Sequence, residues 1–167
     1  STVPVEVAGG VEVAAGAVHF TAALDAKGSA TVSVEAGGRL DFDPDSDVAI
    51  GGKGIHVEGA VTFRGRANLT GPLVTMGSAA VTLDASARVS IGGNVTHSIG
   101  GAAFINAATL EFSAGITRMD APLTGSGHVH VTSGSLLLGP GQHSLGGRGL
   151  AVQGHVALGP GAVLEMA

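Results

Sequence analysis

Four aspartates at every second position form the densest acidic cluster in the chain. They are Asp41, Asp43, Asp45 and Asp47. Carboxylate oxygens are the ligands that a hard cation such as Ca²⁺ takes in proteins, so the cluster is a candidate calcium site. The calcium-loop pattern is incomplete, because Pro44 interrupts it and neither its glycine nor its distal glutamate is present. The alternative is a solvated acidic turn that discourages edge-to-edge strand pairing.

The seven histidines are scattered along the chain. His97 and His143 occupy matching places in two copies of one sequence pattern. We expect them to lie two coils apart, about 10 Å, which is too far to share one metal ion. His128 and His130 flank one apolar residue and should face outward together, but no third ligand accompanies them. Exposed strand histidines therefore explain this set better than a metal centre.

The sequence lacks the residue patterns of the common catalytic sites. The chain has no cysteine, which excludes disulfides and thiolate sites. No serine lies in a Gly-x-Ser-x-Gly elbow, and the Gly-x-Gly triplets separate strands instead of preceding a helix. A carboxylate pair for sugar cleavage would need partners from adjacent coils, but Ser90, Gly92 and Leu137 stand at the places that match the acidic cluster. We expect no enzymatic activity and no cofactor.

Two asparagines fit the acceptor pattern for N-glycosylation, Asn68 with Thr70 and Asn94 with Thr96. They would carry glycans if the protein is secreted by a eukaryotic cell. Asn106 stands where apolar residues occupy the other copies, so we expect it to face inward and bond to backbone, or to mark a bulge.

Composition limits the class of protein. Apolar residues make up 44% of the 167 residues, but aromatic residues only 3%, and 29 residues are glycine. The net charge is −5 without a basic run, which argues against nucleic acid because phosphates need Lys and Arg. No apolar stretch approaches the 18 to 20 residues or so needed to span a membrane, and no signal peptide is evident.

The elements that would position these residues recur along the chain. A 14-residue pattern occurs at 50–63, 99–112 and 145–158, with a shortened copy at 5–13. Apolar residues in it alternate with period two, and glycine-containing turns interrupt every run, which indicates short strands. Such units cannot bury their apolar side alone and must stack on their copies.

A second unit, at 32–42, 81–91 and 129–138, alternates with the first, and both recur every 46 to 50 positions. Half of that distance is about 24 residues, which suits a coil of three short strands. The sequence therefore predicts an all-β fold, a single-stranded parallel β-helix of about seven coils. We treat residues 1–167 as one solenoid segment and expect it to be an excerpt of a longer solenoid.

Stacked coils should align apolar side chains in columns. One predicted column contains Val11, Leu40, Val61, Val89, Leu110, Leu136 and Val156, and the next contains Val13, Phe42, Phe63, Ile91, Phe112, Leu138 and Leu158. The charged residues between them, such as Glu12, Asp41 and Glu111, should point outward.

The glycine-punctuated stretch 123–141, and the similar phrase at 149–161, resemble the repeats of autotransporter passengers and haemagglutinin-like secreted proteins. That resemblance implies a right-handed parallel β-helix and an extracellular or cell-surface location. It carries no functional residue onto this chain.

Three functions compete. The first is a non-enzymatic structural or adhesive module, a rigid rod or packing scaffold whose partners are other proteins or flanking coils of the same polypeptide. The second is a carbohydrate-binding or polysaccharide-cleaving β-helix, which the absence of Trp and Tyr disfavours. The third is ice binding, which needs a threonine ladder, and we do not expect Thr31, Thr62, Thr82 and Thr109 to share a column.

Overall fold

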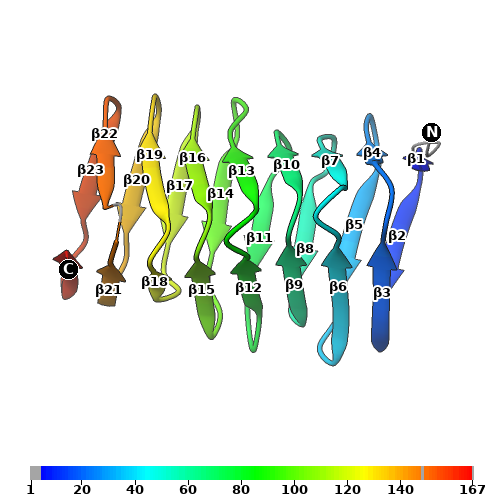
Figure 1. Cartoon of the computed structure of the whole chain (residues 1–167), viewed down its shortest axis with the longest axis horizontal. Coiled ribbons are helices and arrows are strands. Elements are labelled where there is room, and N and C mark those ends of the chain that lie inside the picture. Colours follow the sequence, from blue (N-terminus) through cyan, green and yellow to red (C-terminus); the bar gives the residue numbers. More distant parts are fainter. Residues whose placement is uncertain (1–4, 148, 167) are drawn as a thin grey trace.

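The chain folds into three long parallel sheets that wind around one core (Figure 1). The computed structural model describes residues 5–147 and 149–166, and within them it contains 24 strands and no helix. Consecutive strands belong to different sheets, and every pairing is parallel. Three consecutive strands therefore make one coil, and the described residues form eight coils.

Each sheet takes every third strand of the chain. Sheet 1 contains β1 (Val5–Val7), β4 (Leu24–Ala26), β7 (Asp47–Ile50), β10 (Arg66–Leu69), β13 (Arg88–Ile91), β16 (Thr109–Phe112), β19 (His128–Val131) and β22 (Leu150–Val152). Sheet 2 contains β2 (Gly10–Val13), β5 (Thr31–Val34), β8 (Ile55–Val57), β11 (Leu73–Thr75), β14 (Thr96–Ile99), β17 (Ile116–Met119), β20 (Ser135–Leu138) and β23 (His155–Leu158). Sheet 3 contains β3 (Gly16–Phe20), β6 (Gly38–Phe42), β9 (Ala60–Phe63), β12 (Ala80–Leu83), β15 (Ala103–Asn106), β18 (Leu123–Gly125), β21 (Gly141–Leu145) and β24 (Ala162–Met166).

The predicted all-β solenoid of stacked coils is confirmed, but its dimensions are corrected. There are eight coils of about 21 residues rather than seven of about 24. Ile55 pairs with Leu73, and Leu24 pairs with Val48, so single coils range from 18 to 24 residues. Halving the long repeat gave the wrong length because that repeat does not contain a whole number of coils.

The long repeat spans seven strands, which is two coils and one strand more. Each copy of the 14-residue pattern therefore begins on the next sheet. Val5 lies on β1 of sheet 1, Ile55 on β8 of sheet 2 and Phe104 on β15 of sheet 3. The two predicted columns are wrong for the same reason, because Val11, Leu40 and Val89 stand in different sheets.

Alternation within each strand builds the core. A typical four-residue strand buries its second and fourth side chains, as β9 does with Val61 and Phe63. Phe20, Phe42 and Phe63 stack on successive coils of sheet 3, with ring centroids 5.5 and 5.1 Å apart. Phe112, on sheet 1, is also fully buried, so the three phenylalanines predicted for the core, Phe42, Phe63 and Phe112, all lie there.

The first and last coils leave core positions uncovered. The register places several of their side chains in line with buried residues of the neighbouring coil, yet these side chains are 43 to 54% exposed: Val5, Val152, Leu158 and Met166. Coil-on-coil packing is therefore available at both ends of the solenoid.

Candidate functional site

The structure separates the four aspartates of the acidic cluster. Asp41 lies on β6 of sheet 3, Asp43 and Asp45 lie in the turn that follows, and Asp47 begins β7 of sheet 1. Within the described ranges, no group of three or more His, Cys, Asp or Glu side chains is arranged to hold a metal ion. The calcium site remains a prediction, and thermal unfolding measured with and without calcium tests it.

Asp41 already has cationic partners. Its Oδ2 accepts a hydrogen bond from Arg39 Nε at 2.7 Å, and Arg64 Nη2 lies 3.9 Å from Oδ1. Burial alone would raise the pKa of Asp41, but hydrogen bonds from Arg39 and Thr62 and the charges of Arg39 and Arg64 outweigh it and lower the pKa. Although its place in the strand directs it outward, these neighbours cover it completely. Asp41 therefore belongs to an ion-pair cluster of sheet 3.

His97 and His143 are fully buried, which corrects the prediction that they are exposed strand histidines. They also lie on different sheets, on β14 and β21. His97 Nδ1 accepts a hydrogen bond from the Leu73 amide at 3.2 Å, and its Nε2 donates to the Gly92 carbonyl at 3.0 Å. The backbone pairing of β11 with β14 begins at Val74 and Ser98. The His97 ring therefore satisfies the amide of Leu73, one residue before that pairing begins.

His143 repeats this arrangement on sheet 3. Its Nδ1 accepts from the Leu123 amide at 3.2 Å, and its Nε2 donates to the Gly139 carbonyl at 3.1 Å. In both places a proline directly precedes the leucine that begins the strand on the adjacent coil, Pro72 before Leu73 and Pro122 before Leu123. These histidines satisfy backbone amides inside the core, and both their nitrogens are engaged, so they are structural residues.

Acid should destabilise the fold through His97. Burial lowers the pKa of His97, although the hydrogen bond to the Gly92 carbonyl acts in the opposite direction. Below about pH 6.5 the unfolded histidine takes up a proton that the folded one does not, so stability falls as the pH drops through that value. Urea unfolding between pH 7.5 and 5 measures this loss. His97→Gln keeps an acceptor and a donor but does not titrate, and an unchanged pH slope in that variant would contradict the role.

Asn106, His128 and His130, which the sequence analysis singled out, form hydrogen bonds to nearby groups. Asn106 is buried and accepts a hydrogen bond from the Ala108 amide at 3.0 Å, which confirms that it faces inward and bonds to backbone. His128 and His130 lie on β19, and His130 Nε2 is 2.8 Å from His128 Nδ1. Each ring is thus oriented by the other.

The four threonines do not share one column, as predicted, although one pair of them is in register. Thr62 and Thr82 are register partners on the outer side of sheet 3. Thr31 and Thr109 lie on sheets 2 and 1, and the residue paired with Thr82 on the next coil is Ile105. The threonine ladder is therefore two residues long at this point.

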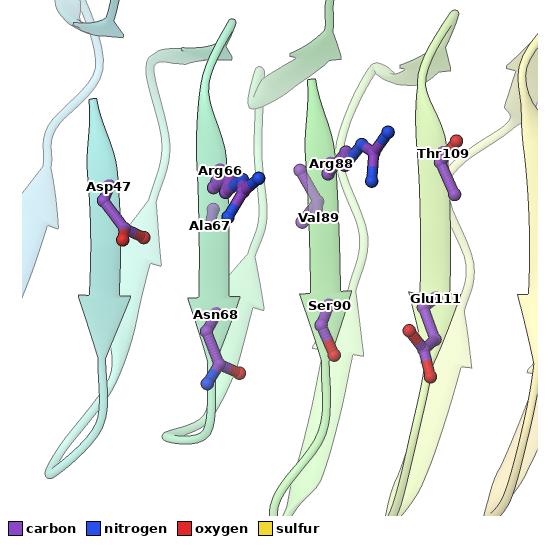
Figure 2. Close-up of a pocket in the computed structure, with 9 residues that line it drawn as sticks. All are labelled: Asp47, Arg66, Ala67, Asn68, Arg88, Val89, Ser90, Thr109 and Glu111. Carbon is purple, nitrogen blue, oxygen red and sulfur yellow. The ribbon is translucent and has the colours of Figure 1, made fainter. Parts of the chain in front are cut away.

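A shallow open depression of about 430 Å³ lies on the outer face of sheet 1, over four successive coils (Figure 2). Its polar lining comes from alternate positions of β7, β10, β13 and β16. The register gives two rows that run across the strands, one of Asp47, Arg66, Arg88 and Thr109, and one of Asn68, Ser90 and Glu111. Sequence reasoning missed this depression, because these residues come together only through the pairing of the coils.

The two carboxylates of the depression do not form a glycosidase pair. Asp47 and Glu111 stand three strand spacings apart, which is about 14 Å. Glycoside hydrolysis needs carboxyl groups within about 5 to 9.5 Å of each other. The depression therefore lacks this carboxylate pair.

Both candidate glycosylation sites are exposed. Asn68 projects from the outer side of β10 into the depression, and Asn94 lies in the turn before β14. A glycan on Asn68 would cover the depression, whereas one on Asn94 would stand at a corner of the coil.

The chain matches no protein-family model, no curated protein and no solved structure. The structure defines it as a parallel β-solenoid of stacked coils. Among the described residues there is no helix of the length and apolarity needed to cross a membrane.

Proposed function

We propose that the protein is a non-enzymatic structural or adhesive module, a rigid solenoid rod of a larger secreted or cell-surface protein. The observation that carries this proposal is the uninterrupted register of eight coils around one apolar core. A stack of this kind holds its outer side chains at fixed spacings along the rod, about 4.8 Å per coil. Such a surface can display groups at a distance or pack against a neighbouring structure.

The two uncovered ends support the scaffold part of the proposal. Leu158 and Val152 on the last coil and Val5 on the first are exposed, although their counterparts one coil inward are buried. Flanking coils or another protein chain could continue the same packing. Each large apolar side chain buried in this way would stabilise the assembly by about 1.5 to 3 kcal/mol. The right-handed coil and the autotransporter-like surface location are part of this proposal.

Surface labelling tests the location. Antibodies raised against the chain are applied to intact and to lysed cells of its source, with and without protease treatment of the intact cells. Labelling of intact cells that protease removes supports the proposal, whereas labelling only after lysis contradicts it. A comparison of cell attachment with and without the protein then separates an adhesive role from a purely structural one.

A carbohydrate-binding solenoid is the second candidate. The polar depression of sheet 1 favours it, because carboxylate, amide and hydroxyl side chains line it together. Binding on a glycan array, in the absence of cleavage of the bound glycans, would support this candidate over the plain rod.

A further inference from the structure

Two arginines in the depression differ from the other arginines that the structure describes. Arg39, Arg64 and Arg118 each lie within 4 Å of an aspartate. In the described part of the chain, Arg66 and Arg88 have no ion pair at that distance. Both are exposed and project from the outer face of sheet 1 (Figure 2).

Arg66 and Arg88 are also direct register partners on adjacent strands. Like charges that face each other across two strands destabilise a sheet, and β10 and β13 lie about 4.8 Å apart. A negatively charged group between the two guanidinium groups removes this repulsion and gains charge-assisted hydrogen bonds. Asp47 is the register partner of Arg66 on β7, but it lies on the side of Arg66 away from Arg88 and forms no ion pair with either arginine within 4 Å. The space between the two arginines is therefore arranged for an external anion.

The neighbouring side chains define what carries the anion. Asn68 and Ser90 are the next outward-facing register pair on the same two strands and offer an amide and a hydroxyl. Asp47 and Glu111 stand at the two ends of the depression. Their carboxylates repel a continuous row of negative groups but accept hydrogen bonds from hydroxyls. The arrangement fits one negative group with hydroxyls around it.

We propose that this depression binds an acidic polysaccharide, with one carboxylate or sulfate group held between Arg66 and Arg88 and sugar hydroxyls bonded by Asn68, Ser90 and the flanking carboxylates. The proposal rests on the second candidate function, the carbohydrate-binding solenoid, and names its ligand class. It disfavours nucleic acid, because successive phosphates would meet Asp47 and Glu111 and the net charge of the chain is −5.

Calorimetric titration of the whole chain with four probes tests the proposal. Polygalacturonate carries carboxylates, dextran sulfate carries sulfates, dextran is uncharged, and single-stranded DNA carries successive phosphates. We expect binding of one or both acidic polysaccharides, weakened by salt, and the stronger of the two identifies the anionic group. Binding of dextran at equal strength, or of DNA as strongly as of the acidic sugars, would overturn the assignment.

A matched pair of variants locates the site. The double variant Arg66→Gln with Arg88→Gln should lose roughly tenfold in affinity per arginine, as expected for charge-assisted hydrogen bonds. The double variant Lys53→Gln with Arg118→Gln removes the same charge outside the depression and should bind like the parent chain. Equal loss in both variants, or no loss in the first, would show that Arg66 and Arg88 form no site. Surface labelling of cells is independent of this result, so the two proposals can fail separately.

Discussion

Replacing Phe42 by alanine should lower the free energy of unfolding by about 3 to 5 kcal/mol, as expected for a large aromatic side chain removed from a packed core. Phe42 is fully buried, and its ring is stacked between those of Phe20 and Phe63 on the two adjacent coils. The truncation therefore removes both stacking contacts and leaves a cavity between coils. Urea unfolding followed by circular dichroism measures the change.

Phe20→Ala is the matched control. Phe20 lies on the first coil, is only partly buried, and stacks on one ring alone, that of Phe42. Its loss should be about half as large. Hydrogen exchange shows whether either change opens the first coils alone, since repeat proteins can unfold from one end. A Phe42→Ala variant as stable as the parent would mean that the phenylalanine stack is absent.

Replacing Gly54 by alanine should cost about 2 to 5 kcal/mol, for two independent reasons. Gly54 forms the corner before β8 with a φ of 82°, a conformation that side chains with a Cβ rarely adopt. A Cβ built there would also lie 1.9 Å from the carbonyl oxygen of Pro72 on the next coil. That oxygen accepts the hydrogen bond of the Ile55 amide, so it cannot move without breaking the contact between coils.

Gly77→Ala separates the two causes. Gly77 has a similar φ of 63°, but a Cβ there would meet nothing within 4 Å. This variant should therefore lose only the conformational part, about 1 to 2 kcal/mol. If both variants melt at the same temperature, the close approach of the coils at Gly54 contributes nothing to stability.

Much of the local structure follows from the sequence. The alternation of Val, Leu, Ile and Phe with polar residues identifies strands and their inner sides, because successive side chains of a strand point to opposite faces. The inward position of His97 could have been found in the same way, since it stands two residues before Ile99 and so on the same side of β14. His143 has the same relation to Leu145.

The grouping of strands into coils could not be read from the repeat. Copies of the pattern stand seven strands apart, and seven is not a multiple of three, so equivalent residues such as Ile55 and Phe104 lie on different sheets. The repeated pattern therefore marks positions seven strands apart, which are not neighbours in a sheet. Sheet pairing instead follows the number of strands in one turn of the coil.

The sequence alone therefore determined the class of fold, the inner and outer side of each strand, and the absence of cysteine chemistry. Only the tertiary structure decided which outer side chains are neighbours. Arg66 and Arg88 are 22 positions apart and belong to no common motif, yet the pairing of β10 with β13 places them side by side. The physical reason is that alternation specifies the side on which a residue lies, whereas the length of each turn between strands specifies what lies next to it on the adjacent coil.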